Sequence, residues 1–93
     1  MRRRGRRNVG FNFNQRYFKP RGIPLRELNE LSISYEELEV LRLRYLEHID
    51  QEKAALKMGI SQSQYQRDLS SVLEKITKAL IEGHAINIMD RDV

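Results

Sequence analysis

Apolar residues in the second half of the chain recur at helical spacing and predict one long helix. Between residues 62 and 82 they form a stripe along one side, at Tyr65, Leu69, Val72, Leu73, Ile76 and Leu80. Most of the residues between them are polar. Such a stripe is typical of a helix that packs on the core of its own domain or on a second copy of the chain, and we interpret it as core.

A glycine separates this helix from a shorter one on its N-terminal side. Ala54 and Ala55 give the shorter helix a side that another helix can approach closely, and Gly59 can adopt the positive φ of a tight turn. Ser61 is suited to cap the long helix, with Gln64 as the reciprocal member of a capping box. This pattern is typical of a helix-turn-helix, whose second helix lies in the major groove of DNA.

Two further helices are predicted upstream. Pro24 suits the first helical position, and leucines recur every three residues after it. Ser34 and Glu37 form a second capping box that begins the next helix. The sequence therefore predicts an all-α fold, a helix-turn-helix bundle with helices over residues 24–31, 35–47, 51–58 and 62–82.

Short extended segments are predicted at both ends of this bundle. Residues 9–13 alternate apolar with small or polar side chains, and Tyr17 and Phe18 form a second extended piece. Residues 85–89 are rich in β-branched side chains and follow Gly83, which suits the position after a helix. These ends can pair as a small sheet, within one chain or between two, or they remain loose tails.

The net charge of +4 conceals a division between a basic arm and an acidic body. Residues 1–26 carry nine of the 17 Arg and Lys and none of the 13 acidic residues, so the remainder is −5. We expect an arm over residues 1–21 and a helix-turn-helix domain over residues 22–93. An arm of this kind binds phosphate, solubilises the chain or neutralises an acidic body. Its candidates for phosphate or minor-groove contacts are Arg2, Arg3, Arg4, Arg6 and Arg7.

The composition excludes several classes of protein. With 93 residues, of which 40% are hydrophobic, the chain fits one domain with a modest core. It has no cysteine, and His48 and His84 lack the paired spacing of a zinc site, so we expect no metal and no cofactor. Apolar runs are too short for a membrane span or a secretory signal. We expect a cytoplasmic protein that is not an enzyme, because no catalytic constellation can be assembled.

The polar side of the predicted recognition helix supplies the candidates for DNA contact. Glutamine can pair with adenine and arginine with guanine in bidentate fashion. The base-contact candidates are Gln62, Ser63, Gln66 and Arg67, although such residues also occur on any solvated helix face. The phosphate-contact candidates on the preceding helix and at the turn are Gln51, Lys53, Lys57 and Ser61.

The sequence also resembles two groups of proteins. Residues 40–45 (Val-Leu-Arg-Leu-Arg-Tyr) and the predicted helix-turn-helix resemble the fourth conserved region of bacterial sigma factors, which reads an upstream promoter element. Nearly the whole chain is similar to a small prokaryotic family, domain-of-unknown-function family 134. That likeness rests on residues 17–20 (Tyr-Phe-Lys-Pro), 22–28 (Gly-Ile-Pro-Leu-Arg-Glu-Leu) and 37–39 (Glu-Leu-Glu). The resemblance implies a sigma-like fold and a role in DNA binding.

Two departures from the sigma-like pattern affect the recognition helix. Asp68 stands where an apolar residue is usual, with Leu69 next to it. Either the helix is rotated so that Leu69 fills the core, or Asp68 is exposed and lowers the affinity for DNA. The helix also lacks the arginine that commonly opens it, which leaves Arg67 as its only cation before Lys75.

These observations together predict a transcriptional regulator that binds double-stranded DNA as a homodimer. The alternative is a sigma-like interaction module whose acidic body docks on RNA polymerase or another regulator. A third interpretation is RNA binding through the arm, with its aromatic rings stacked on bases. The alternation of those rings fits a strand or a core role better.

Overall fold

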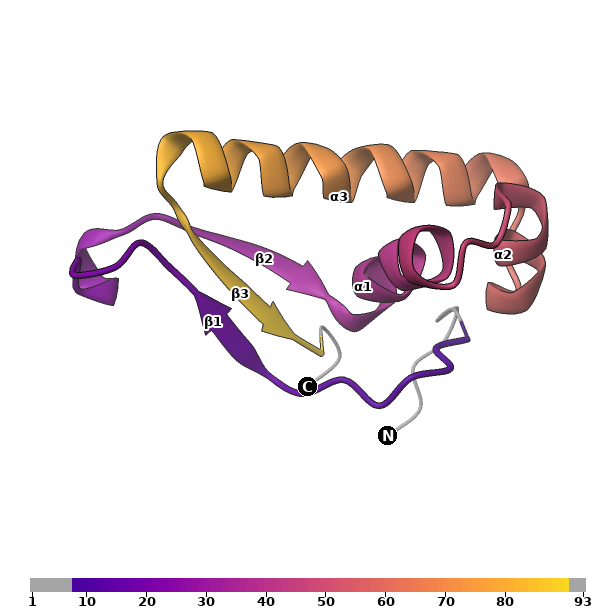
Figure 1. The fold of residues 1–93 in the computed structure, drawn as a ribbon, viewed down its shortest axis with the longest axis horizontal. Helices are drawn as coiled ribbons and strands as arrows, with labels where there is room; N and C mark the ends of the chain where they lie inside the picture. Colours follow the sequence, from indigo (N-terminus) through magenta and orange to yellow (C-terminus); the bar gives the residue numbers. More distant parts are fainter. Residues whose placement is uncertain (1–7, 91–93) are drawn as a thin grey trace.

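A small sheet and three α-helices make up the part of the chain that the computed structural model describes, residues 8–90 (Figure 1). The longest helix runs along the sheet, and the two shorter helices pack against the N-terminal end of this long helix. In chain order the elements are β1 (Arg16–Phe18), the 3-10 turn η1 (Leu25–Glu27), β2 (Glu30–Ser34), α1 (Tyr35–Leu41), the π-helical turn η2 (Arg42–Leu46), α2 (Gln51–Met58), α3 (Gln62–Glu82) and β3 (Ala85–Met89).

The sheet shows that the prediction of an all-α fold is wrong. Its strand order is β1-β3-β2, with β1 antiparallel and β2 parallel to β3. The two terminal segments pair within one chain, and Tyr17 of β1 lies opposite Asn87 of β3. A ladder of two strands is marginal in water. Here β2 adds a third strand and α3 covers part of one face, so the sheet becomes a constituent of the fold.

The prediction of a helix over residues 24–31 is wrong for most of that range, and β2 takes up its last two residues. Only η1 is helical there, Leu28 is extended with φ −116° and ψ 144°, and β2 follows. A spacing of three between leucines also fits the three-residue period of a 3-10 turn. Within β2, Leu31 and Ile33 alternate with polar residues, which is the two-residue period of a strand.

The helix predicted over residues 35–47 begins as expected and then changes type. Ser34 Oγ accepts a hydrogen bond from Glu37 N at 3.1 Å, and the Glu37 carboxylate accepts one from Ser34 N at 2.9 Å, so the capping box is confirmed. After Leu41 the chain widens into η2, where Glu47 N donates to Arg42 O at 3.0 Å across five residues.

Two apolar clusters hold the elements together. Val40, Leu43, Ala54, Ala55, Met58, Tyr65 and Leu69 form one cluster beneath α2 and the first half of α3. Ile33, Val72 and Ile88 form the other, between α3 and the sheet. The interpretation of the whole α3 stripe as core is wrong at Leu73 and Leu80, which are 38% and 74% exposed and lie outside both clusters. Leu69 is only 5% exposed while Asp68 is half-buried, so the helix is rotated such that Leu69 fills the core.

Candidate nucleic-acid interface

The corner between α2 and α3 is a tight turn centred on Gly59. Gly59 adopts φ 71° and ψ 31°, the left-handed conformation that glycine tolerates best, and its N–H donates to the carbonyl of Ala55. Ile60 N donates to the same carbonyl at 3.1 Å. Ala54 and Ala55 are 0% and 2% exposed, so their small side chains allow close packing at this corner. The two helices have the bounds predicted from the sequence, Gln51–Met58 and Gln62–Glu82.

The N-terminus of α3 is capped by one side chain rather than by a reciprocal pair. Ser61 Oγ accepts a hydrogen bond from Gln64 N at 3.0 Å, as predicted. The Gln64 side chain does not return to the cap: its Nε2 donates to Asp68 Oδ1 at 2.7 Å, and its Oε1 accepts from Arg67 Nη2 at 2.8 Å. The predicted capping box is therefore only half present: Ser61 caps the helix, but the Gln64 side chain bonds to Arg67 and Asp68 instead of to the backbone of Ser61.

The polar side of the first turns of α3 points to solvent. Tyr65 and Leu69 are buried on the opposite side, at 0% and 5% exposure, and fix the rotation of the helix. All four residues predicted to contact bases are exposed: Gln62, Ser63, Gln66 and Arg67. All four lie on the same polar side of the first turns of α3, so the structure brings them together on one surface.

The residues predicted to contact phosphates lie beside this surface. Lys53 and Lys57 are exposed on α2, Ser61 is exposed at the turn, and Gln51 is half-buried. Asp50 caps α2 and accepts a hydrogen bond from Lys53 N at 2.9 Å. A carboxylate therefore lies next to the candidates for phosphate contact on α2. The arm residues Arg2, Arg3, Arg4, Arg6 and Arg7 lie outside the described residues.

The segment over residues 8–13, which lies within the predicted arm, is fastened to α2 and α1. We call this segment the strap. Asn8 N donates to Met58 O at 3.0 Å, and Asn8 Nδ2 donates to Lys57 O at 3.4 Å, so the strap meets the last carbonyls of α2. Two residues on, Gly10 N donates to Glu39 Oε2 at 2.9 Å. Residues 9–13 do not form the predicted strand, and Gly10 bonds to a side chain rather than to a neighbouring strand.

Glu39 is the buried anchor of the strap. Its carboxylate accepts hydrogen bonds from Arg42 Nε at 2.8 Å and Nη2 at 2.9 Å, and Glu39 is only 2% exposed. Burial raises the pKa of Glu39, but the hydrogen bonds from Arg42 and Gly10 and the Arg42 charge outweigh it, so the pKa lies below its usual value. The Arg42 guanidinium also lies 5.3 Å from the centre of the Phe11 ring.

The sequence indicates that Arg42 can pair with a carboxylate such as Glu39 or Glu82, but sequence reasoning missed the bond from Gly10 to Glu39. Glu39 lies on a helix that also carries Glu36 and Glu37, and nothing in the linear pattern shows which of the three meets the strap. The available signal was Gly10: a Cβ at that position would lie 3.4 Å from Glu39 Oε2, so a small residue favours the close approach.

Two other features, a metal-binding cluster and a membrane-spanning helix, are not found within residues 8–90. No cluster of three or more His, Asp or Glu side chains there could hold a metal ion. None of the helices in that range combines the length and the apolarity that crossing a bilayer requires. The described surface thus offers a polar helix end, basic side chains beside it and apolar cavities.

The chain matches known proteins over most of its length. The profile of a family described as "Protein of unknown function DUF134" matches residues 1–92. A UPF0251 protein of Halothermothrix orenii is 48% identical over 77 residues, which are 83% of this chain and 57% of that protein. A UPF0251 protein of Methanosarcina acetivorans is 46% identical over 92 residues, 99% of this chain and 56% of that protein. The chain therefore spans a little over half of these two relatives. No solved structure matches it.

Proposed function

This chain belongs to the DUF134 family, and we propose that it is a sequence-specific DNA-binding protein that regulates transcription. In this proposal α2 and α3 act as a helix-turn-helix, and the first turns of α3 enter the major groove. The observation that carries the proposal is the exposed polar surface of Gln62, Ser63, Gln66 and Arg67 directly after a tight glycine turn. Tyr65 and Leu69 hold the other side of the same turns in the core.

The residues of this surface suit direct recognition of base edges. A glutamine side chain can bind adenine, and an arginine side chain can bind guanine, through paired hydrogen bonds worth about 1–3 kcal/mol of discrimination. Arg67 is held by Gln64, which in turn binds Asp68. This chain of hydrogen bonds restricts the guanidinium and reduces the conformational entropy that binding would cost.

The strap supports a role for the arginine arm in the same interface. Asn8 is bonded to the C-terminal carbonyls of α2, so the arginine-rich residues 1–7 of the arm join the described chain beside the α2–α3 turn. Seven residues reach at most about 25 Å when extended, which is enough to pass along the phosphates next to an occupied groove. In the proposal Lys53 and Lys57 bind phosphates from α2, and the arm binds phosphates or the adjacent minor groove.

We extend the proposal to a homodimer because of the C-terminal half of α3. Leu73, Leu80 and Ile81 are 38%, 74% and 79% exposed, and their spacing of seven and eight places them on one side of the helix. Contiguous exposed apolar side chains are typical of protein interfaces. A second copy related by a two-fold axis would cover these exposed side chains on both copies at once.

The deciding experiment selects bound fragments from random double-stranded DNA with the purified full chain. We expect one enriched sequence, and we expect the double variant Gln66→Ala/Arg67→Ala to lose that preference. The matched control is Gln15→Ala/Arg21→Ala, which removes the same two residue types at exposed positions outside the α2–α3 unit. Loss in the first variant alone supports base reading by α3. An unchanged preference in both variants would overturn the proposal.

A second candidate function is docking on a protein such as RNA polymerase. Leu46 and Leu56 are 74% and 79% exposed, and residues 27–93 carry a net charge of −5, which suits a basic protein surface. The same selection distinguishes the two functions, because a protein-docking module enriches no DNA sequence.

A further inference from the structure

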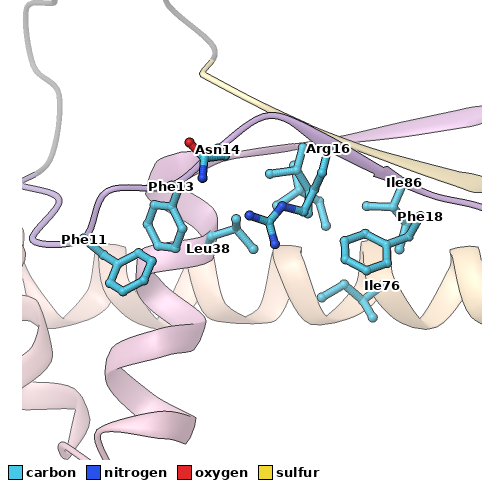
Figure 2. A pocket seen from close by; sticks show the side chains of 10 residues that line it. Phe11, Phe13, Asn14, Arg16, Phe18, Leu38, Ile76 and Ile86 are labelled. Atoms are coloured by element: carbon cyan, nitrogen blue, oxygen red, sulfur yellow. The ribbon is translucent and has the colours of Figure 1, made fainter.

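A cavity of about 360 Å³ opens between β1 and α3 and reaches the apolar core (Figure 2). Ile33 and Ile88, which are 1% and 6% exposed, belong to its lining. The other lining residues come from the strap, β1, α1, α3 and β3, and are Phe11, Phe13, Asn14, Arg16, Phe18, Leu38, Ile76 and Ile86.

The position of α3 over the sheet accounts for this cavity. α3 packs against β2 and β3, while β1 lies at the opposite edge of the sheet (Figure 1). The register pairs Arg16 with Ile88 and Phe18 with Ile86, and directly opposed residues of an antiparallel pair point to the same face. The face that carries Ile86 and Ile88 is therefore extended by β1 beyond the part that the helix covers.

Arg16 occupies an unexpected position on this face. Its neighbours across the strands and along β1 are apolar, so alternation favours another apolar residue there. Figure 2 shows its guanidinium extended between Leu38 and Phe18. No acidic residue lines the cavity, and Arg16 forms no ion pair with any other residue of the described range.

We propose that this cavity binds a small amphipathic carboxylate, with its apolar tail against the isoleucines and its carboxylate on Arg16. Ligand cavities commonly measure about 300–1,000 Å³ and combine apolar walls with a few polar groups that orient the ligand. The planar guanidinium can bind both carboxylate oxygens at once. Asn14 supplies an amide at the same rim. The site goes beyond DNA binding and does not depend on it.

Charge and tail length both select the ligand in this arrangement. An apolar alcohol fits the walls but leaves the guanidinium without an anion, and acetate pairs with the guanidinium but leaves the walls empty. An amine with the same tail meets a like charge. Octanoate is therefore the probe that satisfies both features, and octanol, octylamine and acetate each lack one of them.

The test is a titration of the full chain with octanoate below its micellar concentration, followed by calorimetry and by amide NMR shifts. We expect saturable binding of one octanoate, with shifts centred on Phe18, Ile86 and Ile88 and with weaker or absent binding of the three other probes. Arg16→Gln should weaken octanoate binding about ten- to hundred-fold, since a hydrogen bond to a charged group contributes that much, and should leave octanol binding unchanged. Arg21→Gln, at an exposed position outside the cavity, should have no effect.

Three outcomes would overturn the proposal. The first is an absence of saturable octanoate binding, and the second is octanoate binding that Arg16→Gln leaves intact. The third is a concentration-dependent shift of Phe13 and Leu38, which line the cavity away from Leu80, without any ligand; it would assign the cavity to a contact between two copies of the chain. Because β1 is an edge strand and Arg16 is exposed, its substitution should not prevent folding, which circular dichroism of the variant checks.

Discussion

The phenol of Tyr65 donates a 2.6 Å hydrogen bond to the backbone carbonyl of Val40, and both residues are 0% exposed. This bond joins the second turn of α3 to the end of α1, just before the helix widens into η2. It therefore fixes how α3 is rotated about its own axis. The exposure of Gln66 and Arg67 follows from that rotation.

Replacing Tyr65 by phenylalanine should destabilise the fold by about 1–3 kcal/mol, because the Val40 carbonyl is left buried without this donor. Urea denaturation followed by circular dichroism measures the change in the free energy of unfolding. Tyr17→Phe, at a 51% exposed ring, is the matched control and should have little effect. Equal stability of the Tyr65 variant and the control would mean that the hydrogen bond contributes nothing.

Tyr65 also predicts how stability responds to alkali. Burial raises the pKa of Tyr65 to about 12, and the neighbouring charge of Arg44 lowers it only in part. A phenol whose pKa is raised on folding stabilises the fold fully below its unfolded value, near 10, and this stabilisation is lost as the pH rises through the folded value. Between pH 10 and 12 we expect wild-type stability to fall more steeply than that of Tyr65→Phe, measured by the same denaturation.

The α2–α3 unit could be predicted from the sequence because its determinants are local. Gly59 requires a left-handed turn, Ser61 caps the following helix, and the stripe containing Tyr65 has a clear helical period. The sheet could not be predicted in the same way, because the paired residues of β2 and β3 are 55 positions apart and meet only in the folded chain. The alternation of Leu31 and Ile33 was visible, but leucines three residues apart upstream suggested a helix.

The same distinction between local and long-range determinants applies to the candidate site and to the cavity. The exposed polar surface of α3 follows from helical periodicity within one segment. The strap depends on Gly10 meeting Glu39, 29 residues away, and the cavity depends on Arg16 lying opposite Ile88. Such contacts are set by tertiary packing, which a single sequence does not specify residue by residue.

Glu39→Gln should release the strap. The variant loses the charge that binds Arg42, so we expect a loss of about 1.5–3 kcal/mol of stability and faster hydrogen exchange at the Gly10 amide. Glu74→Gln, at an exposed position on α3, is the matched control. A Gly10 amide that stays equally protected in the Glu39 variant would show that this carboxylate does not hold the strap.

The effect of Glu39→Gln should depend on pH. Because the folded-state pKa of Glu39 is lowered from 4.5, its stabilising effect is present above that value and is lost as the pH falls through the folded pKa. The difference in stability between wild type and variant should therefore shrink on acidification. Denaturation at neutral and at acidic pH measures it, and a constant difference would contradict the assignment.

Removing residues 1–7 should weaken DNA binding and reduce its dependence on salt. Each phosphate that the arm neutralises contributes roughly −0.9 to the log–log slope of affinity against salt concentration. The enriched DNA sequence should remain the same, since base contacts are assigned to α3. Affinities of the full and shortened chains over a range of salt concentrations test this, and an unchanged slope would remove the arm from the interface.

Leu80→Glu should prevent self-association if the apolar stripe on α3 joins two copies of the chain. Leu80 is 74% exposed, so a charge there costs the monomer little, whereas in a two-fold contact it brings two carboxylates into an apolar interface. Leu46→Glu is the matched control, because Leu46 is the same residue at the same 74% exposure but lies on η2. Sedimentation equilibrium should give a dimer for wild type and for the Leu46 variant, and a monomer for the Leu80 variant. A monomeric wild type would overturn the homodimer, and a Leu80 variant that remains dimeric would place the contact elsewhere than on this stripe.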